Sequence, residues 1–432
     1  MNRKLNILKK VFFRLMTPIL FLGILFGIGE IYLRCTTCLG SRPTLNPYLA
    51  DATVGWRGRP NAEVCRSLQN SCAEYRYNRD GFRGPDRPYL KPAGTRRIVV
   101  LGDSFMEGYQ FGDDELMTAK LEAMLNENGA RNEVINIGIS GWGTAQEYLA
   151  YRRFGRLYQP DIVILMMSTC NDIIDTTKQL SDIYKQRLNY LKPYVEVVDD
   201  QMIVHRPAKQ LVRKMNLSPP FYAKEAPFSF WEMLDGFPRF LCRTRVGYYL
   251  WSRWNRPTKL RLLLDDWGLA PFADKLYSTT WGEHGYYHGL SLRFWIYCTN
   301  NDPLWRNALH RELTVIKHLN ERVRANGSRF ILVSGANIEQ AYPDIWDLTL
   351  ETQPQLKQME LNLSLPEERL RQVTEANHIE YISLLPFFQE QAKNGKELFL
   401  RGDGHWSADG QLLAAQVLAR YLHEERSMFA EH

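Results

Sequence analysis

The sequence lacks the motifs that mark several large enzyme classes. It contains no Walker loop, no glycine fingerprint for a dinucleotide and no cysteine and histidine cluster spaced as metal ligands. We therefore expect no cofactor and no metal in its chemistry. Internal repeats and low-complexity tracts are also absent. The 432 residues, 45% of them apolar, are enough for one large α/β domain with additions.

The chain also lacks a basic surface of the kind that binds nucleic acid. Its formal net charge is +6, but five basic residues precede the first acid: Arg3, Lys4, Lys9, Lys10 and Arg14. Without these five, the net charge of the remainder is about +1. We therefore expect no nucleic-acid partner.

Cysteine is scarce, with seven residues in the whole chain. Three pairs are possible, which would leave Cys170 unpaired: Cys35–Cys38, Cys65–Cys72 and Cys242–Cys298. Such pairs would form in an oxidising compartment, although the sequence cannot determine their connectivity. The pair Cys65–Cys72 is the one we favour most. These two cysteines are too far apart in sequence for a zinc knuckle.

The N-terminus is basic and then strongly apolar. Residues 1–11 predict a cytoplasmic tail, and residues 12–33 predict a transmembrane signal-anchor helix of about the 20 residues that a bilayer needs. Basic residues before the span place the rest of the chain outside the cytoplasm, on the periplasmic side of a bacterial inner membrane. A cleaved signal peptide with a site near residues 27–29 is the alternative. The anchor is favoured because the apolar run resumes after Glu30.

The rest of the chain divides into a neck, a main domain and an insertion. Residues 34–95 predict an extracytoplasmic neck of turns and short strands. Its segment 78–84 is expected to lie near the mouth of the main domain's functional site, with its arginines solvated. Residues 96–432 are expected to form the main domain. Its insertion, residues 173–305, begins with a hairpin at 194–204 and is then rich in aromatics. A helical subdomain with an aromatic core is favoured there over a lid, an acyl pocket or a sugar-binding surface.

Apolar strands and amphipathic helices alternate along the main domain. The expected strands are 97–101, 134–137, 162–167, 329–333 and 379–382, and the expected helices include 309–326, 366–377 and 411–421. This alternation predicts an α/β fold, with a parallel sheet covered by helices on both faces.

The first strand ends in Gly102-Asp103-Ser104. Open α/β sheets bind ligands at the carboxyl edge, so a serine placed there can meet a substrate. Its hydroxyl is a poor nucleophile without an adjacent base, and the prediction therefore requires a histidine elsewhere. Taken alone, Gly-Asp-Ser is also a common turn.

Two further strand ends carry groups that can donate hydrogen bonds. Gly141 lies in a glycine-rich loop after the second strand, where its backbone N–H can face a ligand. Asn171 ends the third strand, and its amide can stabilise an oxyanion, whereas Asp172 is expected to fix the loop. Each segment alone is equally compatible with an ordinary turn.

Asp403 and His405 lie two residues apart on a loop near the C-terminus. Histidine suits the role of base because its ordinary pKa is near neutrality. Among the nine histidines, only His405 has a close upstream Asp and a glycine-lined loop. The alternative is a surface histidine before a helix capped by Ser407 or Asp409.

Taken in order, these four segments resemble the four blocks of the SGNH (GDSL-type) hydrolases. The resemblance implies a three-layer α/β/α, flavodoxin-like fold over residues 96–422. It also implies that Ser104 is the nucleophile, His405 the general base and Asp403 the carboxylate that orients it. The oxyanion hole would consist of the Ser104 and Gly141 N–H groups and the Asn171 side chain.

The chain departs from the family pattern at two points. Thr169 stands where the third block usually has glycine, and the last block reads Asp-x-His-Trp instead of Asp-x-x-His. The shorter spacing resembles SGNH-type polysaccharide O-acetyltransferases, including alginate-modifying enzymes. We expect an extracytoplasmic serine esterase acting on O-acyl groups of a cell-envelope glycan or lipid. The alternatives are an O-acyltransferase that moves acetyl groups to a polysaccharide, and a non-catalytic glycan-binding scaffold.

Overall fold

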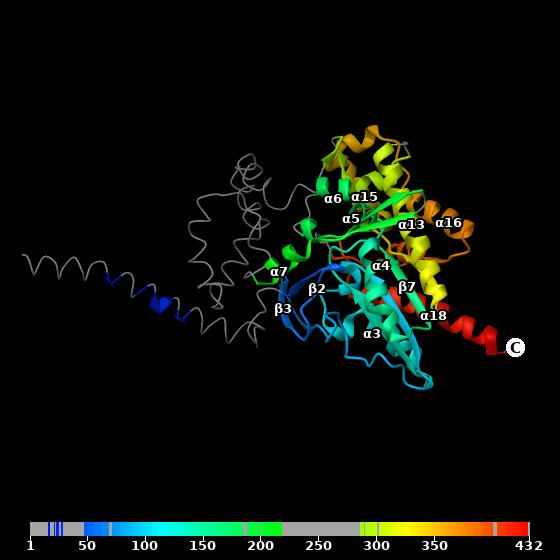
Figure 1. Ribbon diagram of the computed structural model, residues 1–432. Helices are drawn as coiled ribbons and strands as arrows, with labels where there is room; N and C mark the ends of the chain where they lie inside the picture. The colour runs from blue at the N-terminus through cyan, green and yellow to red at the C-terminus, as the bar shows by residue number, and fades with distance from the viewer. Residues whose placement is uncertain are drawn as a thin grey trace, which may run out of the picture. The chain divides into compact units, whose positions relative to one another are not determined.

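The computed structural model describes residues 47–430 except 69–70, 185–187, 200, 218–285, 289, 300–301 and 401–403, together with a few positions between 16 and 28 (Figure 1). The chain divides into two compact units, residues 1–43 with 223–283 and residues 44–222 with 284–432. All the elements below belong to the second unit.

A five-stranded sheet forms the centre of this unit. Its order is β13-β12-β7-β5-β6 and every pair is parallel, with bounds β5 Arg96–Gly102, β6 Asn132–Gly138, β7 Ile162–Met167, β12 Arg329–Ser334 and β13 Glu380–Ser383. The α/β fold with a parallel central sheet is therefore confirmed. The chain adds β6 on one side of β5 and then crosses to β7 on the other. The direction in which strands are added thus reverses at β5, and sheets of this kind bind ligands at the carboxyl ends of the strands beside such a switch point.

The two faces of the sheet contact two separate hydrophobic cores. In β5, Val99 and Leu101 pack into one core, whereas Ile98 and Val100 pack into the other, as the two-residue period of a strand requires. The first core contains residues of α4 (Thr144–Arg153), α13 (Pro303–Ala325) and α16 (Leu365–Ala376). The second contains residues of α3 (Met117–Asn126), α17 (Leu385–Lys393) and α18 (Ala408–Ala430). The result is three layers, α/β/α.

The remaining helices and strands are short. They include α2 (Ser104–Glu107), α5 (Asp172–Thr176), α6 (Lys178–Tyr184), α7 (Lys209–Leu217), α14 (Ile338–Ala341), α15 (Pro343–Thr352), β10 (Tyr286–Tyr287) and β11 (Leu290–Ser291). The predicted hairpin consists of β8 (Tyr194–Val198) and β9 (Gln201–His205), which pair antiparallel. The helix expected at 309–326 begins earlier, at Pro303, because Asp302 accepts the Trp305 N–H at 3.0 Å and caps it.

The described part of the neck belongs to the main core. It contains two hairpins, β1 (Tyr48–Asp51) with β2 (Gly55–Gly58) and β3 (Glu63–Leu68) with β4 (Ser71–Arg76). The side chains of Trp56, Tyr77 and Phe82 are buried in the same cluster as Leu101 of the central sheet. The described part of the neck thus packs against the main domain, as expected, and shares its core.

The expected pair Cys242–Cys298 is wrong. Cys298 is a buried free thiol whose Sγ lies 3.8 Å from the Phe294 carbonyl, so it is not half of a pair with Cys242. Cys242 itself lies outside the described residues. In the β3–β4 ladder Cys65 is opposite Glu74, and Cys72 is opposite Ser67. Cys170 is free, as expected.

Among the residues that the structure describes, no helix is both long enough and apolar enough to cross a bilayer. Most of the expected span at 12–33 lies outside those residues, as does the aromatic stretch 218–285 of the insertion.

Candidate active site

Ser104 and His405 meet at the carboxyl edge of the sheet, although 301 positions separate them. His405 Nε2 lies 2.7 Å from Ser104 Oγ, a distance at which a proton can pass between them. Ser104 is the first residue of α2, directly after β5, and His405 lies on the loop before α18. The structure therefore brings together the two side chains whose approach the prediction required.

Asp103 fixes the turn that carries the serine. Its carboxylate caps α2 by accepting the Phe105 N–H at 2.9 Å, and it also accepts a hydrogen bond from the Asn171 amide at 3.2 Å. Burial raises the pKa of Asp103, while these two hydrogen bonds and the nearby His405 oppose the shift. Close packing requires glycine just before it, because a Cβ at Gly102 would collide with Met106.

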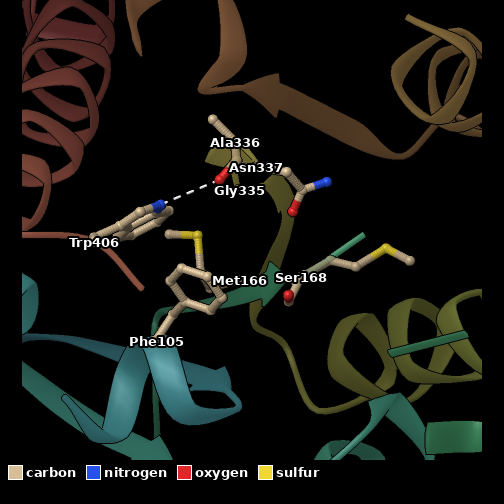
Figure 2. A pocket seen from close by; sticks show the side chains of 8 residues that line it. Phe105, Met166, Ser168, Gly335, Ala336, Asn337 and Trp406 are labelled. Atoms are coloured by element: carbon tan, nitrogen blue, oxygen red, sulfur yellow. Dashed lines mark hydrogen bonds between the residues drawn. The ribbon is translucent and has the colours of Figure 1, made fainter. Parts of the chain in front are cut away.

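The imidazole of His405 is held by its neighbours in sequence and in space. Its ring lies 5.0 Å from the Phe105 ring and 5.5 Å from the Tyr109 ring, between centroids. The next residue, Trp406, is buried and donates its indole N–H to the Ala336 carbonyl at 3.3 Å (Figure 2). Trp406 thus anchors the loop to the segment after β12 and limits the positions that His405 can take.

A small pocket lies beside this anchor, at the carboxyl ends of β7 and β12 (Figure 2). Phe105 and Trp406 lie on one side of it and Ser168 and Asn337 on the other. Met166 also lines it. The walls nearest to Ser104 and His405 are therefore apolar and closely packed.

Asp403 lies outside the described residues. Its role as the carboxylate that orients His405 stays a prediction from the family resemblance.

Two of the three predicted oxyanion donors, Gly141 and Asn171, lie on the loops after β6 and β7, and the third, the Ser104 N–H, lies at the start of α2. Gly141 has a φ of +75°, in the left-handed region that favours glycine. Asn171 precedes α5 and binds Asp103 through its amide nitrogen. A side-chain amide carries two N–H donors, so Asn171 can hold Asp103 and an oxyanion at the same time. Its oxyanion role, like that of the Ser104 and Gly141 N–H groups, remains a prediction.

Thr169 and Asp172 hold the loop that carries Asn171. Thr169 is buried, and its hydroxyl accepts a hydrogen bond from the Asn337 amide at 3.0 Å, which ties the ends of β7 and β12 together. Glycine, which the family usually has at this position, could not accept this hydrogen bond, because it has no side-chain hydroxyl. Asp172 accepts the Ser168 N–H at 2.8 Å, so its expected role in fixing the loop is confirmed.

The burial of several acidic side chains in this part of the chain was not predicted. Burial raises the pKa of Glu147 and Asp172 well above their usual values and that of Glu312 to about 7. Lys192 lies 2.7 Å from Asp175, and burial lowers its pKa. The sequence does not indicate that these acids are buried, because they lie in separate helices and loops and come together only in the folded chain. Among the described residues, no group of histidine, cysteine or acidic side chains is arranged to hold a metal ion.

The expectation of solvated arginines in the neck is wrong for Arg83. Its side chain is fully buried and lies 3.9 Å from the centre of the Tyr75 ring. The guanidinium donates to the carbonyls of Glu107, Gly108 and Phe111 at 2.9 to 3.1 Å and pairs with Asp113 at 2.8 Å. These carbonyls lie at the end of α2 and just beyond it, where a helix leaves acceptors without partners. Arg83 is buried because it satisfies them.

Two family models match the chain. Residues 100–228 match the GDSL-like lipase/acylhydrolase family, and residues 293–431 match the SGNH hydrolase-like domain of the acetyltransferase AlgX. The first segment contains Ser104, Gly141 and Asn171, and the second contains Asp403 and His405. No curated protein matches the sequence.

Solved structures with similar folds include two esterases and a lipase. A catalytic variant of the acetylxylan esterase Axe2 from Geobacillus stearothermophilus is 12% identical, with 77% of this chain and 95% of that chain covered and a TM-score of 0.35. The acetyl xylan esterase AlAXEase is 10% identical, with 74% and 96% covered and a TM-score of 0.34. A GDSL-like lipase from Bacteroides thetaiotaomicron is 12% identical, with 76% and 89% covered and a TM-score of 0.31.

All three TM-scores lie below 0.5, so the assignment rests on the family models and on the motifs of the chain. The protein belongs to the class of enzymes that act on ester bonds. Within that class, the chain carries an SGNH (GDSL-type) hydrolase domain whose C-terminal part is similar to the acetyltransferase AlgX.

Proposed function

We propose that this protein is a serine esterase that removes O-acyl groups from a cell-envelope glycan or lipid. The observation that carries the proposal is the 2.7 Å distance between His405 Nε2 and Ser104 Oγ. A serine hydroxyl becomes an effective nucleophile only when a base takes its proton, and His405 is within reach to do so. The match to a lipase and acylhydrolase family supports the same chemistry.

In the first step, Ser104 Oγ attacks the ester carbonyl carbon as His405 Nε2 takes its proton. The carbonyl oxygen becomes negatively charged, and the N–H groups of Ser104 and Gly141 and the amide of Asn171 stabilise it. When the intermediate collapses, the bond to the alcohol oxygen breaks and His405 gives that oxygen the proton. Asp403 orients the imidazole throughout.

In the second step, an acceptor hydroxyl attacks the acyl-serine. His405 removes the proton of the acceptor and returns it to Ser104 Oγ when the acyl bond to the serine breaks. With water as acceptor, the products are a free acid and the resting enzyme. With a sugar hydroxyl as acceptor, the same intermediate makes the protein an O-acetyltransferase.

The transferase is the second candidate because of a specific observation. The segment that matches the AlgX acetyltransferase domain contains His405, and its Asp-x-His-Trp spacing resembles that of polysaccharide O-acetyltransferases.

We propose that in either case the catalytic domain works outside the cytoplasm, held by the apolar segment 12–33. Protease accessibility in spheroplasts tests this location, because a cytoplasmic domain would stay protected.

The decisive experiment compares the full-length protein with Ser104→Ala in the cleavage of p-nitrophenyl acetate. We expect the variant to lose at least about 10³-fold in kcat, because the nucleophile is gone. A product that shifts from acetate to an acetylated oligosaccharide when the oligosaccharide is added would favour the transferase. Equal activity of the two proteins would contradict both candidates and favour a glycan-binding scaffold.

A further inference from the structure

The carboxylate of Glu107 gathers hydrogen bonds from three segments of the chain. Glu107 is the last residue of α2, and its side chain is completely buried. It accepts hydrogen bonds from the hydroxyl of Tyr48 at 2.9 Å and from the hydroxyl of Tyr77. On its other side it accepts the backbone N–H of Ser140 at 2.7 Å and the Ser140 hydroxyl. Every described partner of this carboxylate is a donor.

The contact with Ser140 joins the nucleophile to the glycine-rich loop. Helix α2 begins with Ser104 and ends with Glu107, so the attacking hydroxyl and the carboxylate lie on one helix of four residues. Ser140 directly precedes Gly141, the predicted oxyanion donor. Because Glu107 holds Ser140 by both its backbone and its side chain, the position of the loop follows the position of α2.

The neck reinforces both ends of this connection. The indole of Trp56 donates to the Ser140 carbonyl at 3.0 Å, and the indole of Trp142 donates to the Trp56 carbonyl at 2.9 Å. Arg83 holds the carbonyls at the end of α2. The loop is thus bound through the N–H, the carbonyl and the side chain of the one residue that precedes Gly141.

We propose that Glu107 is a positioning residue that holds the Gly141 N–H against the nucleophile through Ser140. The inference rests on the proposed function, since it concerns the stabilisation of the oxyanion. Donors to a developing charge are effective only when they are already in place, and a displacement of about 1 Å can cost roughly 10²-fold in rate. An acceptor that fixes the neighbouring amide meets this requirement without touching the substrate.

Two substitutions separate positioning from plain structural support. Glu107→Leu keeps the approximate volume but removes the acceptor, and leaves the Ser140 N–H without its partner. Glu107→Gln keeps one carbonyl oxygen for that N–H, and its NH₂ group can donate to the oxygen of a surrounding hydroxyl. The matched control is Glu127→Leu, at an exposed glutamate after α3.

We expect Glu107→Leu to lower kcat by roughly 10- to 100-fold while KM changes by less than about threefold. Glu107→Gln should restore most of kcat, and the control should match the wild type. Amide hydrogen exchange of the peptide 138–143 should speed up in Glu107→Leu and stay near the wild-type rate in Glu107→Gln. If Glu107→Leu does not fold, Ser140→Ala provides a milder test with the same two measurements.

Unchanged exchange in the loop would overturn the proposal, because Glu107 would then not hold it. An unchanged kcat in Glu107→Leu and Ser140→Ala, with Ser104→Ala inactive, would also overturn it. If Ser104→Ala keeps full activity, the proposed function fails. The exchange measurement then still decides whether Glu107 fixes the loop.

Discussion

The amide of Asn171 lies 3.2 Å from the carboxylate of Asp103, the residue before the nucleophile. This single contact connects the end of β7 to the end of β5 across the switch point of the sheet. It also orients the Asn171 amide, because one of its two N–H groups is committed to Asp103. The second N–H then has a defined direction.

Replacing Asn171 by alanine should therefore reduce kcat by about 10²- to 10³-fold, the usual effect of removing one oxyanion donor. The protein should still fold, since the change removes one hydrogen bond at the edge of the sheet. Steady-state kinetics and a thermal melt measure the two effects. Asn326→Ala, at the C-terminus of α13, is the control that should keep its kcat. A kcat within threefold of wild type in Asn171→Ala would exclude the oxyanion role.

The pH dependence of the free energy of unfolding should show the titration of the buried Glu312 carboxyl group. Burial raises its pKa from 4.5 to about 7, so between these values the folded state binds a proton that the unfolded state has released. The free energy of unfolding should thus fall as pH rises from 4.5 towards 7, and level off above. For this one group the change is on the order of 3 kcal/mol.

Glu312→Gln removes this titration and keeps the shape of the side chain. We expect urea denaturation to show a gain in the stability of the variant relative to wild type between pH 5 and pH 8. Glu375→Gln, at an exposed position of α16, should show no such gain. A constant difference between Glu312→Gln and wild type across this range would be evidence against a raised pKa.

Arg83→Met should destabilise the fold by about 3 kcal/mol, because it leaves three buried carbonyls and Asp113 without their donor. The urea midpoint should fall with little change in the slope. Arg79→Met, at an exposed arginine of the same neck segment, should have a far smaller effect. Similar midpoints for the two variants would show that the buried contacts of Arg83 contribute little.

Cys298 should be recovered as a single alkylated cysteine when the protein is denatured in iodoacetamide without a reductant. Burial raises the pKa of its thiol to about 11, so the same reagent should label it slowly in the folded state at pH 7. Peptide mass spectrometry distinguishes the outcomes. A peptide that joins Cys298 to Cys242 would contradict the free thiol seen in the structure.

The local pattern of apolar and polar residues along the chain was sufficient to predict the fold class and many of the candidate site residues. Each strand of the parallel sheet is a short apolar run, and each predicted functional residue directly follows such a run or precedes a helix. Since parallel strands end at the same edge, the sequence predicted Ser104 and Asn171 at one edge of the sheet, and the family resemblance predicted that they share a site. His405 was recognised because of its loop and its nearby Asp403.

The tertiary structure alone decided the burial of Arg83 and the hydrogen bonds of Glu107. Both are charged residues, and the sequence around each contains nothing that distinguishes them from solvated residues. Their environment is created by groups from distant segments: the carbonyls at the end of α2, the hydroxyls of Tyr48 and Tyr77, and the loop at Ser140. A pattern along one strand or helix reports which face is apolar. It cannot report which polar groups the fold brings together inside, because those pairings depend on the packing of the whole domain.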